Sequence, residues 1–235
     1  MIKKTAIIIG ASADIGQAIA KEYSENGYNL ALTYNSTKIK GIDAQKYQLN
    51  LKNSNEIENV FGDIKKDCKD IDTLVFVAGT SQKRKLIIDV ENDEIDNIFE
   101  TNTKSAIKCI REFAKIANKD SANIVLIGSF VEKNGCSCES VYTASKAALS
   151  GLCKSLATEL GMLNMRINVV APGFIDTKMN NNLSKEEKDE IANMTPLKRL
   201  GTPQDIANIA VFLSSDKASF VTGQTIYVDG GLILD

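Results

Sequence analysis

The alternation of short apolar runs with longer stretches of helical periodicity constrains the fold of this chain most strongly. Several of the short runs are apolar throughout instead of alternating, as expected of strands that are covered on both faces. The sequence predicts strands at Thr5–Ile9, Leu30–Tyr34, Tyr47–Leu49, Thr73–Val77, Ile124–Gly128, Ile167–Val170 and Thr225–Val228.

Helical patterns fill the intervals between these runs, at Ile15–Asn26, Asn55–Lys66, Asp93–Asn118, Val141–Leu160 and Asp205–Leu213. Thr202-Pro203 opens the last helix, Gly161 follows the fourth, and Ser184–Glu187 is a capping box that opens a shorter helix. Strand–helix alternation predicts an α/β fold, a Rossmann-like, doubly wound parallel sheet of about seven strands with helices on both faces. Because no linker or repeat divides the chain, residues 1–235 are predicted to form one domain.

Composition excludes several classes of protein. The 235 residues include no His, which removes His-ligated metal sites and Ser-His-Asp triads, and among five Cys only Cys136 and Cys138 lie close together. No metal site and reduced thiols are therefore predicted. With 28 Lys+Arg against 30 Asp+Glu, nucleic-acid binding has no electrostatic support. No apolar run approaches the ~20 residues of a membrane helix, so we expect no membrane association and a cytoplasmic protein.

A glycine-containing turn follows the first predicted strand, at Gly10-Ala11-Ser12-Ala13-Asp14-Ile15-Gly16. Glycines at such a junction let the backbone approach a pyrophosphate, which binds at the helix N-terminus where N–H groups and the helix dipole favour an anion. Only Gly10 and Gly16 are glycine, so the GxGxxG pattern is not met. The position of the turn, at the first strand–helix junction, favours dinucleotide binding over an ordinary turn.

Tyr142 and Lys146 place a phenol and an ammonium four residues apart, on one face of a predicted helix. A nearby cation favours the phenolate and lowers a Tyr pKa, so that the phenol can exchange a proton with a substrate oxygen. A surface pair is the alternative interpretation of this spacing alone. Ser129, just past the strand Ile124–Gly128, lies at the carboxyl edge where doubly wound sheets bind ligands, and this favours the catalytic interpretation.

These motifs together resemble the short-chain dehydrogenase/reductase family over almost the whole chain, and look most like bacterial 3-oxoacyl-(acyl-carrier-protein) reductases. The resemblance rests on Gly10-x-x-x-Asp14-Ile15-Gly16, Ala78-Gly79, Asn102, Ser129, Tyr142-x-x-x-Lys146, Pro172-Gly173 and Asp229-Gly230-Gly231.

The resemblance implies a role for each matching residue. Tyr142 would be the general acid, Ser129 would hydrogen-bond the substrate carbonyl, and Lys146 would hold the nicotinamide ribose and lower the Tyr pKa. Asn102 would shape the backbone around a proton-relay water. The cofactor-binding set would be Gly10, Ser12, Asp14, Ile15, Asn35, Ser36, Asn50, Leu51, Ala78, Gly79, Tyr142, Lys146, Pro172, Gly173, Ile175 and Thr177.

The sequence departs from the family pattern at three places. Ile9 replaces the Thr that opens the family's glycine turn. Asp14 replaces a glycine, and a carboxylate near a pyrophosphate should weaken cofactor binding unless it points away, for instance by capping the helix from Ile15. Phe76-Val77 replaces a pair of Asn residues that would brace strand and loop. These departures concern cofactor affinity more than chemistry.

The leading hypothesis is an NADPH-dependent reductase of a 3-oxoacyl thioester, as in fatty acid biosynthesis, whose substrate is a small molecule or is linked to an acyl carrier protein. NADP(H) is favoured over NAD(H) because Ala31–Ile42 contains no acidic residue to bind a ribose 2′-hydroxyl, whereas Tyr34–Lys38 offers hydroxyls, an amide and a cation. The alternatives are a short-chain dehydrogenase that acts on another ketone or alcohol, such as a sugar, polyol or steroid, and a catalytically silent dinucleotide-binding regulator. The segments Phe174–Arg199 and Phe130–Ser140 are expected to build the substrate pocket.

Assembly is predicted from the helices Asp93–Asn118 and Val141–Leu160. The second carries a run of small residues that permits close helix approach, and the resemblance implies that both helices pair across a two-fold axis. Thr225–Asp235 would form a second interface. Two such interfaces give a homotetramer.

Overall fold

The computed structural model describes residues 3–180 and 183–234, in which seven strands form a single sheet with every neighbouring pair parallel. The strand order is β3-β2-β1-β4-β5-β6-β7. The strands are β1 Thr5–Ile9, β2 Asn29–Tyr34, β3 Gln45–Gln48, β4 Ile71–Phe76, β5 Ala122–Ile127, β6 Met165–Pro172 and β7 Thr225–Val228. The predicted α/β doubly wound fold is confirmed.

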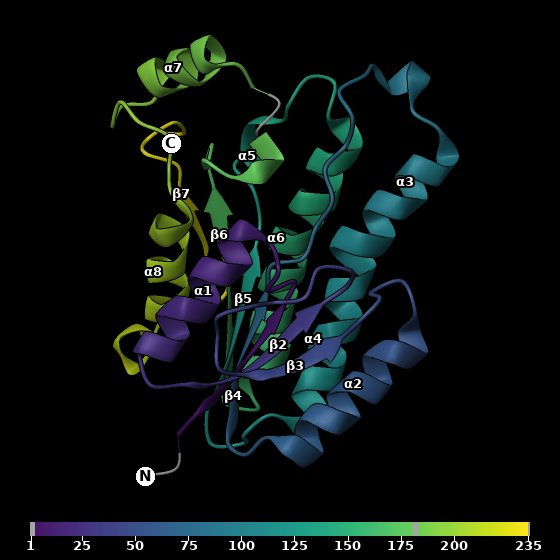
Figure 1. The fold of residues 1–235 in the computed structure, drawn as a ribbon, viewed down its shortest axis with the longest axis vertical. Helices are drawn as coiled ribbons and strands as arrows, with labels where there is room; N and C mark the ends of the chain where they lie inside the picture. Colours follow the sequence, from purple (N-terminus) through teal and green to yellow (C-terminus); the bar gives the residue numbers. More distant parts are fainter. Residues whose placement is uncertain (1–2, 181–182, 235) are drawn as a thin grey trace.

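Helices cover both faces of the sheet (Figure 1). Their bounds are α1 Asp14–Glu25, α2 Ser54–Asp67, α3 Asn92–Phe99, α4 Ser105–Ile116, α5 Val131–Asn134, α6 Ser140–Gly161, α7 Lys185–Met194 and α8 Pro203–Ser214. One apolar core packs α1 and α8 against the sheet, and a second packs α2, α4 and α6 against the opposite face. Every residue of β1, β4 and β5 is buried, which explains their continuous apolar sequences.

Local signals located most element boundaries to within two residues. The capping boxes at Ser184 and at Thr202, with Pro203 in the first turn, are both present. Gly161 is the last residue of α6 instead of following it, a difference within the usual uncertainty of helix ends. The third strand begins two residues earlier than predicted and ends at Gln48, because its register is set by pairing with β2.

The predicted single helix Asp93–Asn118 is wrong in detail. The chain forms α3, then a π-helical turn at Glu100–Lys104, and then α4, which ends at Ile116. A π turn inserts one extra residue per turn and is frequent at functional sites, and helical periodicity alone does not show it. Here the inserted turn contains Asn102.

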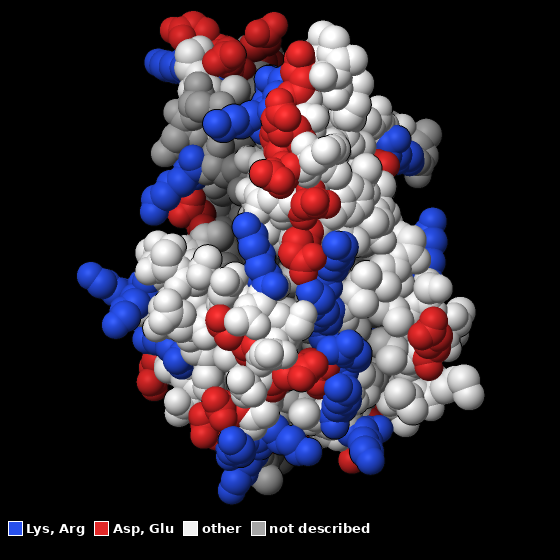
Figure 2. Space-filling view, turned by 90° about the vertical axis from the view of Figure 1, so that its right-hand side faces the viewer, with Lys and Arg blue, Asp and Glu red and all other residues white. Residues whose placement is uncertain are grey.

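The charged residues on the surface are mixed in sign, as expected from the nearly equal numbers of acidic and basic residues. Figure 2 shows Lys and Arg interspersed with Asp and Glu over the face that carries α2 and α3. Among the described residues, no helix is long and apolar enough to cross a membrane. All five cysteines are free thiols, and Cys109 and Cys153 are buried.

Candidate active site

A cleft of about 1230 Å³ opens at the carboxyl ends of the strands. It lies where the strand order reverses, since β2 and β3 extend from β1 in one direction and β4 to β7 in the other. Ligands of doubly wound sheets bind at this switch point. The volume exceeds the roughly 300–1,000 Å³ of ordinary small-molecule pockets, which leaves room for a dinucleotide together with a substrate. Helix α7 lies at this end of the molecule (Figure 1).

Two positions near the turn after β1 require glycine, Gly10 because it packs against the loop after β4 and Gly16 because it packs against the turn itself. Gly10 has φ +86, and a Cβ there would lie 2.8 Å from the backbone N of Ala78. A Cβ on Gly16 would lie 2.5 Å from the carbonyl oxygen of Gly10. The Gly10 N–H donates to Thr33 Oγ1 at 3.1 Å. This packing leaves Ser12, Asp14 and Ile15 lining the cleft at the N-terminus of α1, where an anion is favoured.

Asp14 does not cap α1 as proposed from the sequence, because the helix begins at Asp14 itself and Ala13 is the N-cap residue. Its carboxylate instead accepts the backbone N–H of Lys178 at 2.7 Å, and the Lys178 ammonium lies 3.6 Å away. The Asp14 side chain, which replaces a family glycine, thus connects the turn after β1 to the segment after β6. A contact between residues 164 positions apart leaves no local sequence signal.

We expect Asp14→Ala to change the dissociation constant for the nicotinamide nucleotide by less than about threefold, because the carboxylate already faces a cation and an N–H group. Hydrogen exchange at Lys178–Asn180 should increase, since the Lys178 N–H loses its acceptor. Fluorescence titration and exchange mass spectrometry measure the two effects. More than tenfold tighter nucleotide binding would show that the carboxylate opposes the phosphates.

The remaining predicted cofactor residues mostly share the same cleft. Asn35, Asn50 and Leu51 line it at the ends of β2 and β3, whereas Ser36 is exposed and lies outside the lining. Lys38 is also exposed, and Thr37, which was not in the predicted set, lines the cleft. On the other side the lining includes Ala78, Gly79, Pro172, Gly173, Ile175 and Thr177.

Three of the predicted catalytic side chains lie close together, near the carboxyl end of β5 and in the first turns of α6. Ser129, Tyr142 and Lys146 all line the cleft. Lys146 is 4% exposed and donates from Nζ to the Ile127 carbonyl oxygen at 2.8 Å, while Nζ lies 5.9 Å from the centre of the Tyr142 ring. The backbone carbonyl of Ile127 thus holds the Lys146 ammonium in place, close to the phenol of Tyr142.

The pKa of Tyr142 differs from the sequence-based expectation. Burial raises the pKa of Tyr142 to about 12, and a hydrogen bond with Ser129 opposes this shift. Burial also lowers the pKa of Lys146 to about 8, against the attraction of Glu132. The predicted lowering of the Tyr pKa by Lys146 is therefore absent, because desolvation of the phenol dominates. A phenol with this pKa is protonated at neutral pH and can act as a proton donor.

Asn102 lies behind the cleft wall, fully buried in the π-helical turn. Its Oδ1 accepts the Thr80 N–H at 2.8 Å, and its Nδ2 donates to the Thr80 carbonyl at 2.9 Å and to Ser145 Oγ at 3.0 Å. Ser145 in turn donates to the Tyr142 carbonyl at 2.7 Å. Asn102 therefore connects the loop after β4 to the backbone of the helix that carries Tyr142.

Two polar residues near the site were missed from the sequence. Glu132 on α5 accepts a hydrogen bond from Ser150 Oγ at 2.5 Å, and burial raises its pKa. Its Oε2 has no hydrogen-bond partner within the part of the chain that is described. Gln82, 5% exposed, lines the cleft and contacts the start of α6. Neither residue belongs to a motif, and only the folded arrangement reveals them.

Several known proteins are similar to the chain over nearly its full length. A family model described as enoyl-(acyl carrier protein) reductase matches residues 10–233. The 3-oxoacyl-(acyl-carrier-protein) reductase FabG of Staphylococcus epidermidis is 35% identical over 245 residues, which cover 99% of this chain and 100% of the relative. An uncharacterized oxidoreductase of Bacillus subtilis, YmfI, is 36% identical over 98% of this chain and 99% of its own length.

Solved structures agree with this similarity. A short-chain dehydrogenase/reductase from Brucella melitensis, named a glucose/ribitol dehydrogenase, has a TM-score of 0.91 and 29% identity, covering 99% of this chain and 97% of that one. A short-chain dehydrogenase/reductase from Serratia marcescens has a TM-score of 0.90 and 26% identity, with 97% of each chain covered.

The fold and the site define a nicotinamide-dinucleotide-dependent oxidoreductase that acts on carbonyl or CH–OH groups. The chain belongs to the short-chain dehydrogenase/reductase family. The cleft fits the cofactor: the helix N-terminus lines one part, and a buried ammonium stands beside a phenol in another.

Proposed function

We propose that the protein is an NADPH-dependent reductase of 3-oxoacyl thioesters that serves fatty acid biosynthesis. The observation that carries the proposal is the 35% identity to reductases of this name across the whole of both chains. The substrate is a β-ketone whose thioester is carried by an acyl carrier protein or by a small thiol.

In the proposed reaction a bound nicotinamide cofactor would supply the hydride that reduces the carbonyl carbon. The carbonyl π electrons move onto oxygen, and Tyr142 donates its phenolic proton to that oxygen, so that the ketone becomes a secondary alcohol. The Ser129 hydroxyl donates a hydrogen bond to the same oxygen. The Lys146 ammonium would hold the nicotinamide ribose and stabilise the phenolate that forms on Tyr142.

The walls of the substrate part of the cleft support an acyl substrate. Phe130 and Phe174 lie with ring centroids 5.0 Å apart, and both line the cleft. They come from the two segments expected to build the pocket, Phe130–Ser140 and Phe174–Arg199, of which the second includes residues 181–182, outside the described residues. An apolar pair that includes the residue after Ser129 fits a short acyl chain.

The test compares NADPH oxidation with acetoacetyl thioesters, simple ketones and sugars. We expect kcat/KM for the acetoacetyl thioester to be the highest of the panel. A sugar preferred by tenfold or more would overturn the proposal. That second candidate is supported by the name of the Brucella melitensis structure, a glucose/ribitol dehydrogenase. A silent regulator would oxidise no nucleotide with any of these compounds.

The preference for NADPH is a prediction of its own. Lys38 and Thr37 follow the end of β2, and neither is acidic. A charge-assisted bond contributes about 1.5–3 kcal/mol, so we expect kcat/KM to be at least about tenfold higher with NADPH than with NADH. Lys38→Glu should reverse this ratio, whereas Lys40→Glu, an exposed control two residues further on, should retain it. A higher kcat/KM with NADH in the unmodified protein would contradict the prediction.

A homotetramer is proposed from the exposed faces of α4, α6 and the C-terminal segment. Ile107 on α4 is 46% exposed, and a Cβ on Gly151 of α6 would meet nothing within 4 Å. Phe220 is fully exposed just before β7, and Leu234 is 81% exposed after it. Asp235, part of the predicted second interface, lies outside the described residues.

Light scattering is expected to give roughly four times the chain mass of 25.6 kDa. A monomer at micromolar concentration would reject both interfaces, and a dimer would reject the C-terminal one. Within each subunit we propose a single domain, because the sheet takes strands from Thr5 to Val228.

A further inference from the structure

The helix that carries Tyr142 begins without a cap from its own sequence. Its N-cap residue is Glu139, whose side chain makes no capping hydrogen bond within the described part of the chain. The first N–H groups of a helix have no partner inside the helix, and a cap normally accepts those of the second and third residues. In α6 these residues are Val141 and Tyr142.

Gln82 supplies the missing cap from another part of the fold. Its Oε1 accepts the N–H of Val141 at 2.9 Å and the N–H of Tyr142 at 3.1 Å. Its Nε2 donates to the Cys138 carbonyl oxygen at 3.3 Å. The side chain is 5% exposed, so these bonds compete little with water. The Gln82 amide thus uses its oxygen for two hydrogen bonds and one of its two N–H groups for a third.

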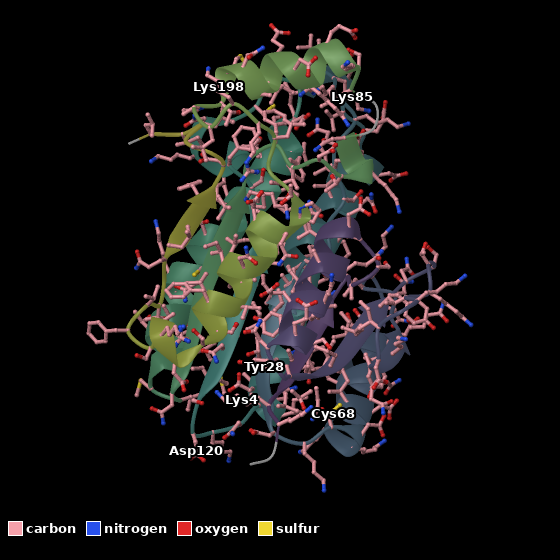
Figure 3. All side chains as sticks on the ribbon, turned by 60° about the vertical axis from the view of Figure 1, so that its left-hand side comes forward. Lys4, Tyr28, Cys68, Lys85, Asp120 and Lys198 are labelled. Carbon is pink, nitrogen blue, oxygen red and sulfur yellow. The ribbon has the colours of Figure 1, made fainter. Side chains whose placement is uncertain are left out.

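Neighbouring residues secure Gln82 in this position. The Lys85 N–H donates to the same Cys138 carbonyl at 3.1 Å, and Arg84 Nε donates to Glu139 Oε1 at 2.8 Å. Cys138 has φ 67, a left-handed conformation that a non-glycine residue rarely adopts. Figure 3 shows Lys85 at the end of the molecule where α7 lies, far from Lys4 and Asp120 at the opposite end.

The backbone of Tyr142 is therefore held on both sides. Gln82 binds its N–H, and Ser145 Oγ, which Asn102 holds, binds its carbonyl oxygen. Gln82 and Asn102 both act on the loop after β4: Asn102 bonds Thr80, and Gln82 is two residues further along. That loop begins with Ala78-Gly79, which lines the cleft.

We propose that Gln82 is a positioning residue for Tyr142: its side chain fixes the first turn of α6 relative to the loop after β4, and so places the phenol over the reacting carbonyl. The inference rests on the proposed role of Tyr142 as proton donor. Gln82 itself touches neither the reacting atoms nor the proton that moves. A misplacement of about 1 Å can cost on the order of 10² in rate, which sets the size of the expected effect.

The variants Gln82→Met and Gln82→Glu test the proposal. Met keeps the length of the side chain and removes all three bonds, and we expect kcat to fall more than fivefold while the nucleotide dissociation constant stays within twofold. Glu can still accept both N–H groups, which the helix dipole favours, so it should recover at least half of the lost kcat. Gln224→Met is the matched control, because Gln224 is exposed and, within the described residues, its side chain donates only to the Thr222 carbonyl in the same turn.

A second measurement does not depend on the substrate. Ultraviolet titration of the Tyr142 phenol, taken as the difference between each protein and its Tyr142→Phe counterpart, should give a lower pKa in Gln82→Met than in the unmodified protein, because a displaced phenol is better hydrated. If the unmodified protein reduces no 3-oxoacyl thioester, the proposed function fails and this titration alone decides the inference. A kcat within fivefold of the unmodified value, nucleotide affinity that falls in parallel, or an unchanged phenol titration would each overturn the role of Gln82.

Discussion

Tyr142→Phe is expected to lower kcat by at least about 10²-fold, because the ring remains and only the transferable proton is lost. The phenol is protonated at neutral pH, since burial raises its pKa to about 12. Since the substitution removes only the hydroxyl, the loss should appear in kcat and not in nucleotide binding. Steady-state kinetics and a nucleotide titration of the purified variant measure the two quantities.

Tyr47→Phe is the matched control for this experiment. Its hydroxyl donates to Asp67 Oδ2 at 3.0 Å at an exposed site, away from the cleft. We expect normal turnover in the control. Near-normal turnover in Tyr142→Phe would remove the proton donor from the account.

Lys146→Ala is expected to be comparably damaging, with kcat/KM lowered by about 10²-fold or more. The substitution removes the cation beside the phenol and the proposed ribose contact, and it leaves the Ile127 carbonyl without its donor. Lys154→Ala, which changes an exposed Lys on the same helix, should have little effect. Unchanged kinetics in Lys146→Ala would contradict the role of the ammonium.

The lowered pKa of Lys146 predicts that activity declines as the pH rises. The pKa of Lys146 lies near 8, below the usual value for Lys, because burial disfavours its charged form. The ammonium is therefore present below about pH 8 and is lost as the pH rises through that value. Since kcat/KM reports groups of the free enzyme, kcat/KM for the nucleotide should decline above about pH 8. Lys146→Ala should lack this decline, and a flat profile in the unmodified protein would contradict it.

The fold was predictable because its strands are buried on both faces. The runs Thr5–Ile9 and Ile124–Gly128 can be recognised as strands from their own apolar residues. The capping boxes at Ser184 and Thr202 each involve residues only three positions apart in the sequence. Helical periodicity does not detect a single inserted residue, which is why the π turn around Asn102 was missed. Its side-chain bonds to Thr80 and Ser145 make this turn part of the site.

The candidate site was predictable as a set of motifs, and the structure brings most of its residues to one cleft. What the sequence lacked were the contacts between distant segments. Asp14 bonds Lys178 across 164 positions, and Gln82 caps Tyr142 across 60. The direction of the Tyr142 pKa shift was also wrong, because the i, i+4 spacing shows the cation but not the burial that outweighs it.

Transfer of deuterium to acetoacetyl thioester, from NADPH labelled at both C4 positions of the nicotinamide, tests the central claim most directly. If the chain is a reductase that uses Tyr142 as its proton donor, mass spectrometry will show one deuterium at C3 of the 3-hydroxybutyryl product, and Tyr142→Phe will form this product at least about 10²-fold more slowly. A product without deuterium, or no oxidation of the nucleotide with any carbonyl compound, would contradict the account.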